Sequence, residues 1–213
     1  MVMEAPVTPH KRYEQTVRAY TAFFSAFMGF GLKAVIDHKE WGHERWVCFA
    51  ITLPLFLRYL LGSSNQLWYE YVREDPSARL RSLILWDFCW LLTFGILGMV
   101  ICYTNSVQGF LRGTAVFGLV ATLGPLWDKW IKDRKGIQMN EFWFEWFRIN
   151  AIFTFVALVT AIVYRNGFGK LQSVYGVDWS LIVLAIASIA IMFFDLRHQL
   201  HVLEPAETDR PDD

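Results

Sequence analysis

The sequence predicts an all-α integral membrane protein, a polytopic bundle of about six transmembrane helices with both termini in the cytoplasm. Apolar residues make up 54% of the 213 residues, above the usual 45–50%, and ten of the residues are Trp. The 20 basic and 20 acidic residues fall mainly between long apolar stretches. A third observation, the uneven distribution of Lys and Arg between alternate loops, predicts the orientation.

Six apolar stretches are of a length that suits membrane spans. A helix needs about 20 apolar residues to cross a bilayer, and Lys or Arg at its ends can extend to the headgroups. The membrane domain is expected over residues 17–202, and the six spans near residues 17–36, 45–67, 81–104, 107–127, 147–165 and 178–197.

The composition of these stretches favours a bilayer over a soluble bundle. A surface helix of a soluble protein carries a polar stripe along one side. Residues 149–164 and 180–194 carry no charge and show no such stripe. A chain of this size has no means of burying six helices that are apolar all round, so lipid is the expected surrounding.

The positive charges divide unequally between the two sides of this arrangement. One side carries 13 Lys and Arg and the other carries 6, with Arg58 left out because it lies within a span. The first set is Lys11, Arg12, Arg18, Arg73, Arg79, Arg81, Lys129, Lys132, Arg134, Lys135, Arg148, Arg197 and Arg210. Because positive residues remain on the cytoplasmic side, we expect the cell membrane as the location and both termini inside.

The parts outside the spans differ in character. Residues 1–16 are polar and are expected to form a cytoplasmic segment without a cleavable signal peptide. Thr104, Asn105 and Ser106 predict a tight helical hairpin. The longest cytoplasmic connection starts at Asp128, and its aromatic part, residues 136–147, is expected to lie along the membrane interface before the fifth span. The alternative is that this part simply begins the fifth helix. Residues 203–213 form an acidic, proline-containing tail that we expect to be disordered.

Two charged residues interrupt the spans and are the candidate site. Arg58 and Asp87 lie in stretches that are otherwise uncharged, where ionised groups are costly and often functional. Counted along their helices at 1.5 Å per residue, both fall at a similar depth, so we expect them to form an ion pair. Asn65 and Tyr69 follow Arg58 at helical spacing and extend a polar face. Two interpretations stay open: the pair lines a pathway, or it holds two helices together.

No metal or cofactor site is expected. His38 and His43 share a polar loop, and His198 and His201 lie three residues apart near the last span, so metal binding by either pair is an open alternative. The interpretation favoured for both pairs is a solvated loop or helix end. No span carries a His for haem or a central Lys for retinal, and we found no catalytic motif, so an enzyme is not expected.

These observations favour a homo-oligomeric channel or transporter for an ion or small solute, embedded in the lipid bilayer. The alternative is a non-catalytic membrane scaffold or effector that binds a cytoplasmic protein partner through its loop and tail. Nucleic acid is not expected as a partner, because the charges balance and phosphate binding needs a surplus of Lys and Arg.

Overall fold

A computed structural model describes residues 9–68, 71, 83–137, 142–167 and 176–203. In chain order, its helices are α1 (Pro9–Asp37), the short 3₁₀ helix η1 (Lys39–Trp41), α2 (Glu44–Trp68), α4 (Ile84–Cys102), α5 (Val107–Arg134), α6 (Phe142–Arg165) and α7 (Trp179–Leu203). In the described part of the chain, six of these helices are long and apolar enough to span a membrane, which confirms the prediction of six such helices.

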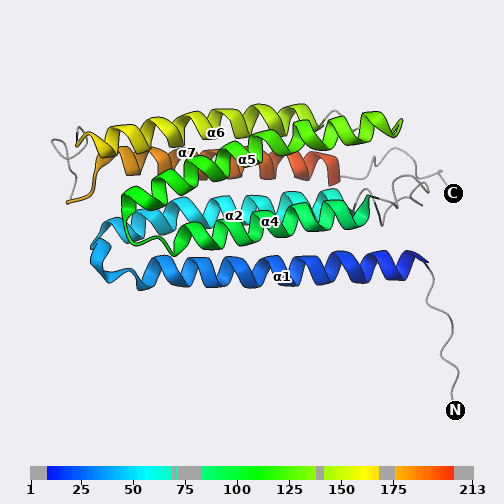
Figure 1. Ribbon diagram of the computed structural model, residues 1–213, viewed down its shortest axis with the longest axis horizontal. Helices are drawn as coiled ribbons and strands as arrows, with labels where there is room; N and C mark the ends of the chain where they lie inside the picture. The colour runs from blue at the N-terminus through cyan, green and yellow to red at the C-terminus, as the bar shows by residue number, and fades with distance from the viewer. Residues whose placement is uncertain (1–8, 69–70, 72–82, 138–141, 168–175, 204–213) are drawn as a thin grey trace, which may run out of the picture.

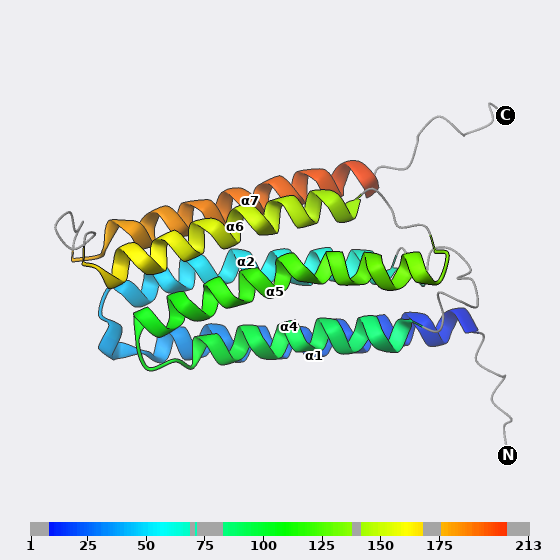
Figure 2. The ribbon, with the colours of Figure 1, turned by 45° about the horizontal axis from the view of Figure 1, so that its top comes forward.

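The six long helices lie side by side and form three layers of two (Figures 1 and 2). Figure 2 shows α6 and α7 in one outer layer, α2 and α5 in the middle, and α1 and α4 in the other outer layer. Neighbouring helices pack in a closed ring, in which α1 meets α2, α2 meets α7, α7 meets α6, α6 meets α5, α5 meets α4 and α4 meets α1. Since α1 begins and α7 ends at the same end of the bundle, we call it the terminal end, and we call the opposite end the hairpin end.

The two middle helices are the most enclosed. Of the apolar windows of α2 and α5, 56% and 50% are buried, against 28–33% in the other four helices. Each middle helix also contains a proline, Pro54 in α2 and Pro125 in α5. A proline inside a helix leaves the carbonyl four residues earlier without its backbone partner. Five buried polar side chains of the described residues lie on these two helices, namely Thr52, Arg58, Ser63, Thr114 and Lys132.

Small residues on α5 let its neighbours approach closely. A Cβ atom built on Gly118 would lie 2.7 Å from Thr154 Oγ1 and 3.2 Å from Thr154 Cα, both on α6. A Cβ on Gly124 would lie 2.9 Å from Trp90 Nε1 on α4. These two glycines thus allow close approach of α6 on one side of α5 and of α4 on another.

The hairpin between α4 and α5 is as short as the sequence predicts. Ser106 precedes the first residue of α5 with an extended backbone, and its Oγ accepts from the Gly109 amide at 3.0 Å. This is an N-cap, which satisfies one of the amides that the first helical turn leaves without a partner.

Several helix boundaries differ from the predicted ones, and the end of α5 is a clear case. The fourth span was expected to end at residue 127, but α5 continues to Arg134. Its 28 residues measure about 42 Å at 1.5 Å per residue, longer than the ~30 Å of a hydrocarbon core. The added turns are stabilised in part by Lys132, whose Nζ lies 2.9 Å from Asp128 Oδ2 and which is 1% exposed.

The separate interfacial segment predicted over residues 136–147 is wrong for its second half. Phe142 to Phe147 form the first turns of α6, which is the alternative that we left open. The aromatic side chains do not require a separate segment, because they are equally compatible with a helix end at the membrane interface. Residues 138–141 and the tail beyond Leu203 lie outside the described residues.

Candidate functional site

The largest fully buried side chain of the described bundle is a charged one, Arg58 of α2, which is 1% exposed. It lies where the middle helix α2 faces α6 and α7. An ionised group in such surroundings is costly unless hydrogen bonds and an opposite charge compensate it. The neighbours of Arg58 therefore define the site.

Arg58 bonds to two other helices. Its Nε donates to Asp195 Oδ2 of α7 in an ion pair whose carboxylate side chain is only 5% exposed. Its Nη1 donates to Asn150 Oδ1 of α6 at 2.7 Å. Asn150 is itself 1% exposed, and its Nδ2 donates to the Ala121 carbonyl of α5 at 3.0 Å. One polar network thus connects four helices: α2, α5, α6 and α7.

Aromatic rings surround the guanidinium. Its Cζ lies 5.4 Å from the ring centre of Tyr59 and 5.0 Å from that of Trp146, within the range of cation–π attraction. Tyr59 also donates to Asn150 Oδ1 at 3.0 Å. Arg58 Nη2, by contrast, is buried and has no hydrogen-bond partner among the described residues. An arginine presents five N–H donors, so this side chain retains donor capacity toward a further acceptor.

The predicted ion pair between Arg58 and Asp87 is wrong. Asp87 is buried in the first turn of α4 and accepts from Tyr71 Oη at 2.5 Å, whereas Arg58 pairs with Asp195. Arg58 is about 15 Å before the end of α2 and Asp87 is about 5 Å after the start of α4 at 1.5 Å per residue, so the two residues do not lie at the same depth. Because the bundle places α7 beside α2 and directs Arg58 toward it, the acidic partner comes from the last helix.

The other two predicted members of the site have different outcomes. Asn65 is half-buried near the end of α2 and does not belong to the Arg58 network described here. Tyr69 lies outside the described residues.

Sequence reasoning missed Asp195 and Asn150 for different reasons. Asp195 stands directly after the uncharged run 180–194 and was taken for the end of the span, but α7 continues to Leu203. At 1.5 Å per residue, Asp195 is about 12 Å before that helix end. Asn150 carries no charge, so a search for charged residues within the spans passed over it. A search for amides in the apolar runs would have found it.

An aromatic cluster and a small cavity continue from Arg58 toward the hairpin end. The ring of Tyr59 lies 4.9 Å from that of Phe117 and 5.6 Å from that of Phe94, and the last two lie 5.6 Å from each other. Beyond them α2, α4 and α5 enclose a cavity of about 20 Å³, room for about one water molecule. Its lining is Thr52, Leu55, Phe56, Gly98, Ile101, Cys102, Phe110, Thr114 and Phe117.

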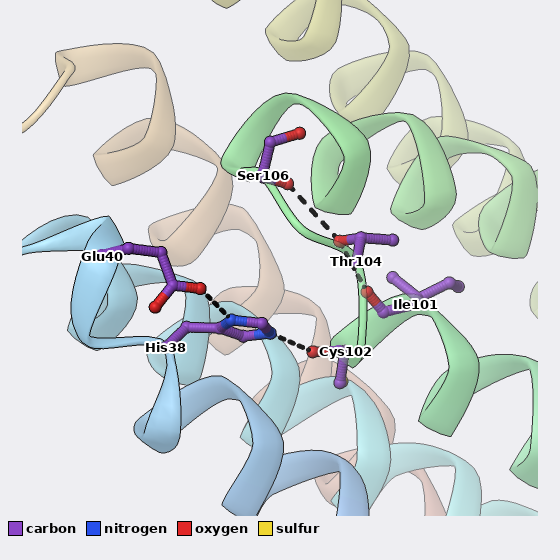
Figure 3. Close-up of polar contacts among 6 residues, drawn as sticks. All are labelled: His38, Glu40, Ile101, Cys102, Thr104 and Ser106. Atoms are coloured by element: carbon purple, nitrogen blue, oxygen red, sulfur yellow. Dashed lines mark hydrogen bonds and ion pairs between the residues drawn. The ribbon is translucent and has the colours of Figure 1, made fainter.

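The connection between α1 and α2 closes the hairpin end above this cavity. Trp41 is buried and lies 5.9 Å from Phe110, ring centre to ring centre. His38 stacks on Trp41 at 4.1 Å with an interplanar angle of 8°. Figure 3 shows that the His38 ring lies between Glu40 and the end of α4, where Nε2 is 3.0 Å from the Cys102 carbonyl oxygen.

A metal site does not emerge among the described residues, where no three His, Cys, Asp or Glu side chains are placed to hold an ion together. His38 is engaged as above, and His43 is exposed on the same connection. The side chains of His198 and His201 lie outside the described part of the structure. A third buried carboxylate, Asp178, accepts from the Ser180 amide and hydroxyl at the start of α7 and so acts as a helix cap.

Comparison with known proteins adds no relative to this description. No protein-family model, no curated protein and no solved structure matches the chain. Function therefore has to be argued from the site itself.

Proposed function

We propose that the protein is a multi-pass membrane transport protein and that Arg58 receives a small anion, or the anionic group of a small solute, on its way through the bundle. One observation carries this proposal: a fully buried arginine, inside a bundle of six apolar helices, retains a donor, Nη2, that bonds to nothing in the part of the chain that the structure describes. Intramembrane charged residues of this kind mark substrate and ion pathways.

The arrangement around Arg58 leaves one edge of the guanidinium for a bound anion while Asp195 stays on the other edge. Asp195 contacts the guanidinium through Nε, while Nη1 and Nη2 form the other edge of the fork. An oxyanion bound at that edge would accept two parallel N–H bonds, the geometry that guanidinium groups favour. Asn150 would give up the bond from Nη1 and keep the bond from Tyr59. When no anion is bound, the carboxylate of Asp195 compensates the positive charge of Arg58.

The route proposed for the solute follows the middle layer. It runs from the hairpin end through the cavity between α2, α4 and α5, past Tyr59, Phe94 and Phe117, to Arg58. The aromatic cluster closes the route in this conformation, so transport requires these rings to move. The route lies within one chain, and the homo-oligomer predicted from sequence is a separate proposal that the mass of the protein in detergent tests.

Flux into liposomes tests the transport proposal. Purified protein in proteoliposomes should pass one or more small anions, tested as a panel of chloride, nitrate, acetate and phosphate beside sodium and potassium. Arg58→Gln should abolish anion flux. Arg18→Gln is the matched control, since Arg18 forms an exposed pair with Glu14 on α1, and it should retain flux. Equal flux with Arg58→Gln, after a check that the variant is folded and monodisperse, would remove Arg58 from the mechanism.

A scaffold or effector role is the second candidate. The added turns of α5 favour it, because they present Trp127 and Trp130 at nearly half exposure beside the Lys129–Asp133 pair. Arg134 lies 3.9 Å from the ring centre of Trp130. Aromatic and Arg side chains of this kind are enriched at protein interfaces. Absence of flux for every ion of the panel, together with co-purification of a partner that Trp130→Ala abolishes, would favour this role.

A further inference from the structure

The two ring nitrogens of His38 both face oxygen atoms that only accept hydrogen bonds. Nδ1 lies 2.5 Å from Glu40 Oε1, and Nε2 lies 3.0 Å from the backbone oxygen of Cys102 (Figure 3). A carboxylate and a carbonyl have no proton to donate. A neutral imidazole carries one N–H and satisfies one of these partners, whereas the imidazolium carries two and satisfies both.

Each partner independently favours the charged ring. Glu40 supplies a negative charge, and its carboxyl pKa is lowered by its own backbone amide and then by His38, so it stays ionised at neutral pH. Cys102 is the last residue of α4, and its carbonyl is among those that the end of a helix leaves without an intrahelical partner. The negative end of the helix dipole also attracts a cation.

The other charged groups of this end have different partners or are exposed to solvent. Lys33 pairs with Asp37 along α1. Glu44 of α2 accepts from Tyr164 of α6 at 2.8 Å. Arg112 of α5 is exposed, and Tyr103, after α4, lies near Lys33. Among the described residues, Glu40 is thus the titratable side chain bonded to His38.

These two bonds connect parts of the chain that are distant in sequence. His38 belongs to the connection between α1 and α2, and Cys102 begins the hairpin between α4 and α5. The same connection holds Trp41 against Phe110, and both Phe110 and Cys102 line the cavity between α2, α4 and α5. Separation of the two connections would therefore release two residues that line the cavity, Phe110 and Cys102, from their contacts with Trp41 and His38.

We propose that His38 is a proton-operated latch that holds the hairpin end of the bundle closed when it is protonated. At low pH the imidazolium donates to both Glu40 and Cys102. When the imidazolium loses its proton, only one ring nitrogen still carries an N–H, so one of the two bonds is lost. The ring nitrogen that has lost its proton then faces an oxygen atom lone pair to lone pair, which is repulsive. The connection between α1 and α2, which carries Trp41, therefore separates from the α4–α5 hairpin.

Hydrogen–deuterium exchange of the full chain in lipid nanodiscs tests the latch without reference to transport. The readout is the protection of peptides that cover residues 38–46 and 99–106, corrected for the intrinsic base-catalysed rate at each pH. Between about pH 5.5 and 8 the wild-type protection factor should fall by about tenfold, which corresponds to about 1.4 kcal/mol.

Two glutamine variants separate the latch from general effects of pH. His38→Gln cannot carry a charge, so its protection of both peptides should be low and should not change with pH beyond the intrinsic correction. His43→Gln is the matched control, an exposed histidine on the same connection, and it should behave like the wild type. A wild type without pH-dependent protection, or a His38→Gln variant that retains it, would overturn the proposal. Neither result depends on whether the protein passes anions, so this test and the flux test fail separately.

Discussion

Arg58 of α2 and Asp195 of α7 form a buried ion pair between residues that are 137 positions apart in the chain. The pair connects the middle layer of the bundle to an outer layer. Asn150 and Tyr59 extend it, so that the four helices α2, α5, α6 and α7 are held by one network.

Removal of one partner of this pair should destabilise the protein strongly. Arg58→Ala or Asp195→Ala should each cost about 3–5 kcal/mol, because each leaves a buried charge without compensation. The double variant Arg58→Met, Asp195→Leu should recover much of the loss. Thermal unfolding in detergent measures all three. As a control, the effects of Arg58→Ala and Asp87→Ala should be additive, since Asp87 is bonded to Tyr71 instead. Strong coupling between Arg58 and Asp87 would contradict the structure.

Asn150 should be sensitive to small changes in its amide. Asn150→Leu removes the acceptor of Arg58 and Tyr59 and the donor to the Ala121 carbonyl, and each buried group left unsatisfied costs about 1–3 kcal/mol. Asn150→Asp keeps an acceptor oxygen for Arg58 and Tyr59, loses the donor to the Ala121 carbonyl and adds a negative charge, which the Arg58 guanidinium partly compensates. We therefore expect a lower unfolding temperature for the Leu variant than for the Asp variant. The reverse order would show that Asn150 acts through packing alone.

Gly118 should not accept a side chain. A methyl group there meets Thr154, including its backbone Cα at 3.2 Å, so α5 and α6 would have to separate. Overpacking of this kind costs about 1–3 kcal/mol, and Gly118→Ala should lower the unfolding temperature in detergent accordingly. Gly29→Ala is the matched control, because nothing lies within 4 Å of a Cβ at that position of α1. It should leave stability equal or raise it, since Ala has the higher helix propensity.

Stability should fall in acid partly through Glu40. Its pKa is lowered by its own backbone amide and by His38, so the folded state binds the proton of this carboxyl more weakly than the unfolded state. The stabilisation is present above the ordinary carboxyl pKa of about 4.3 and is lost as pH falls through the lowered value. Glu40→Gln should therefore flatten the decline of unfolding temperature between about pH 5 and 3. An unchanged pH profile in the variant would exclude this contribution.

Orientation in the membrane is open to a direct test. The bias of 13 positive residues against 6 predicts that the terminal end faces the cytoplasm. Reporter fusions after Asp213 should give a cytoplasmic signal, and an insertion near Lys170, in the connection between α6 and α7, should give an external one. An external signal from the fusion after Asp213 would reverse the model of orientation.

The sequence by itself determined the number of helices and where most of them lie. Runs of about 20 apolar residues separated by charges predict membrane-spanning helices, since a helix satisfies its own backbone polar groups within each run. The tight hairpin at residues 104–106 is a local feature of the same kind, and the sequence predicts it because so few polar residues separate two apolar runs. Position 58 was also identifiable, because an ionised residue within such a run is rare.

Only the tertiary structure decided which residues meet. Sequence spacing measures depth from the predicted helix ends, but α2 ends one residue later and α4 begins three residues later than predicted, which places Arg58 deeper and Asp87 shallower than expected. The choice of partner depends instead on the order of helices in the ring and on the rotation of each helix about its axis. Both are set by contacts between helices, such as Gly118 against Thr154 and Gly98 against Phe56. In each contact a glycine on one helix leaves the space that a side chain of the facing helix fills. These contacts place α7 beside α2, so that Arg58 pairs with the carboxylate of Asp195. The apolar period of a single helix does not reveal such a pair, because it says nothing of which helices become neighbours.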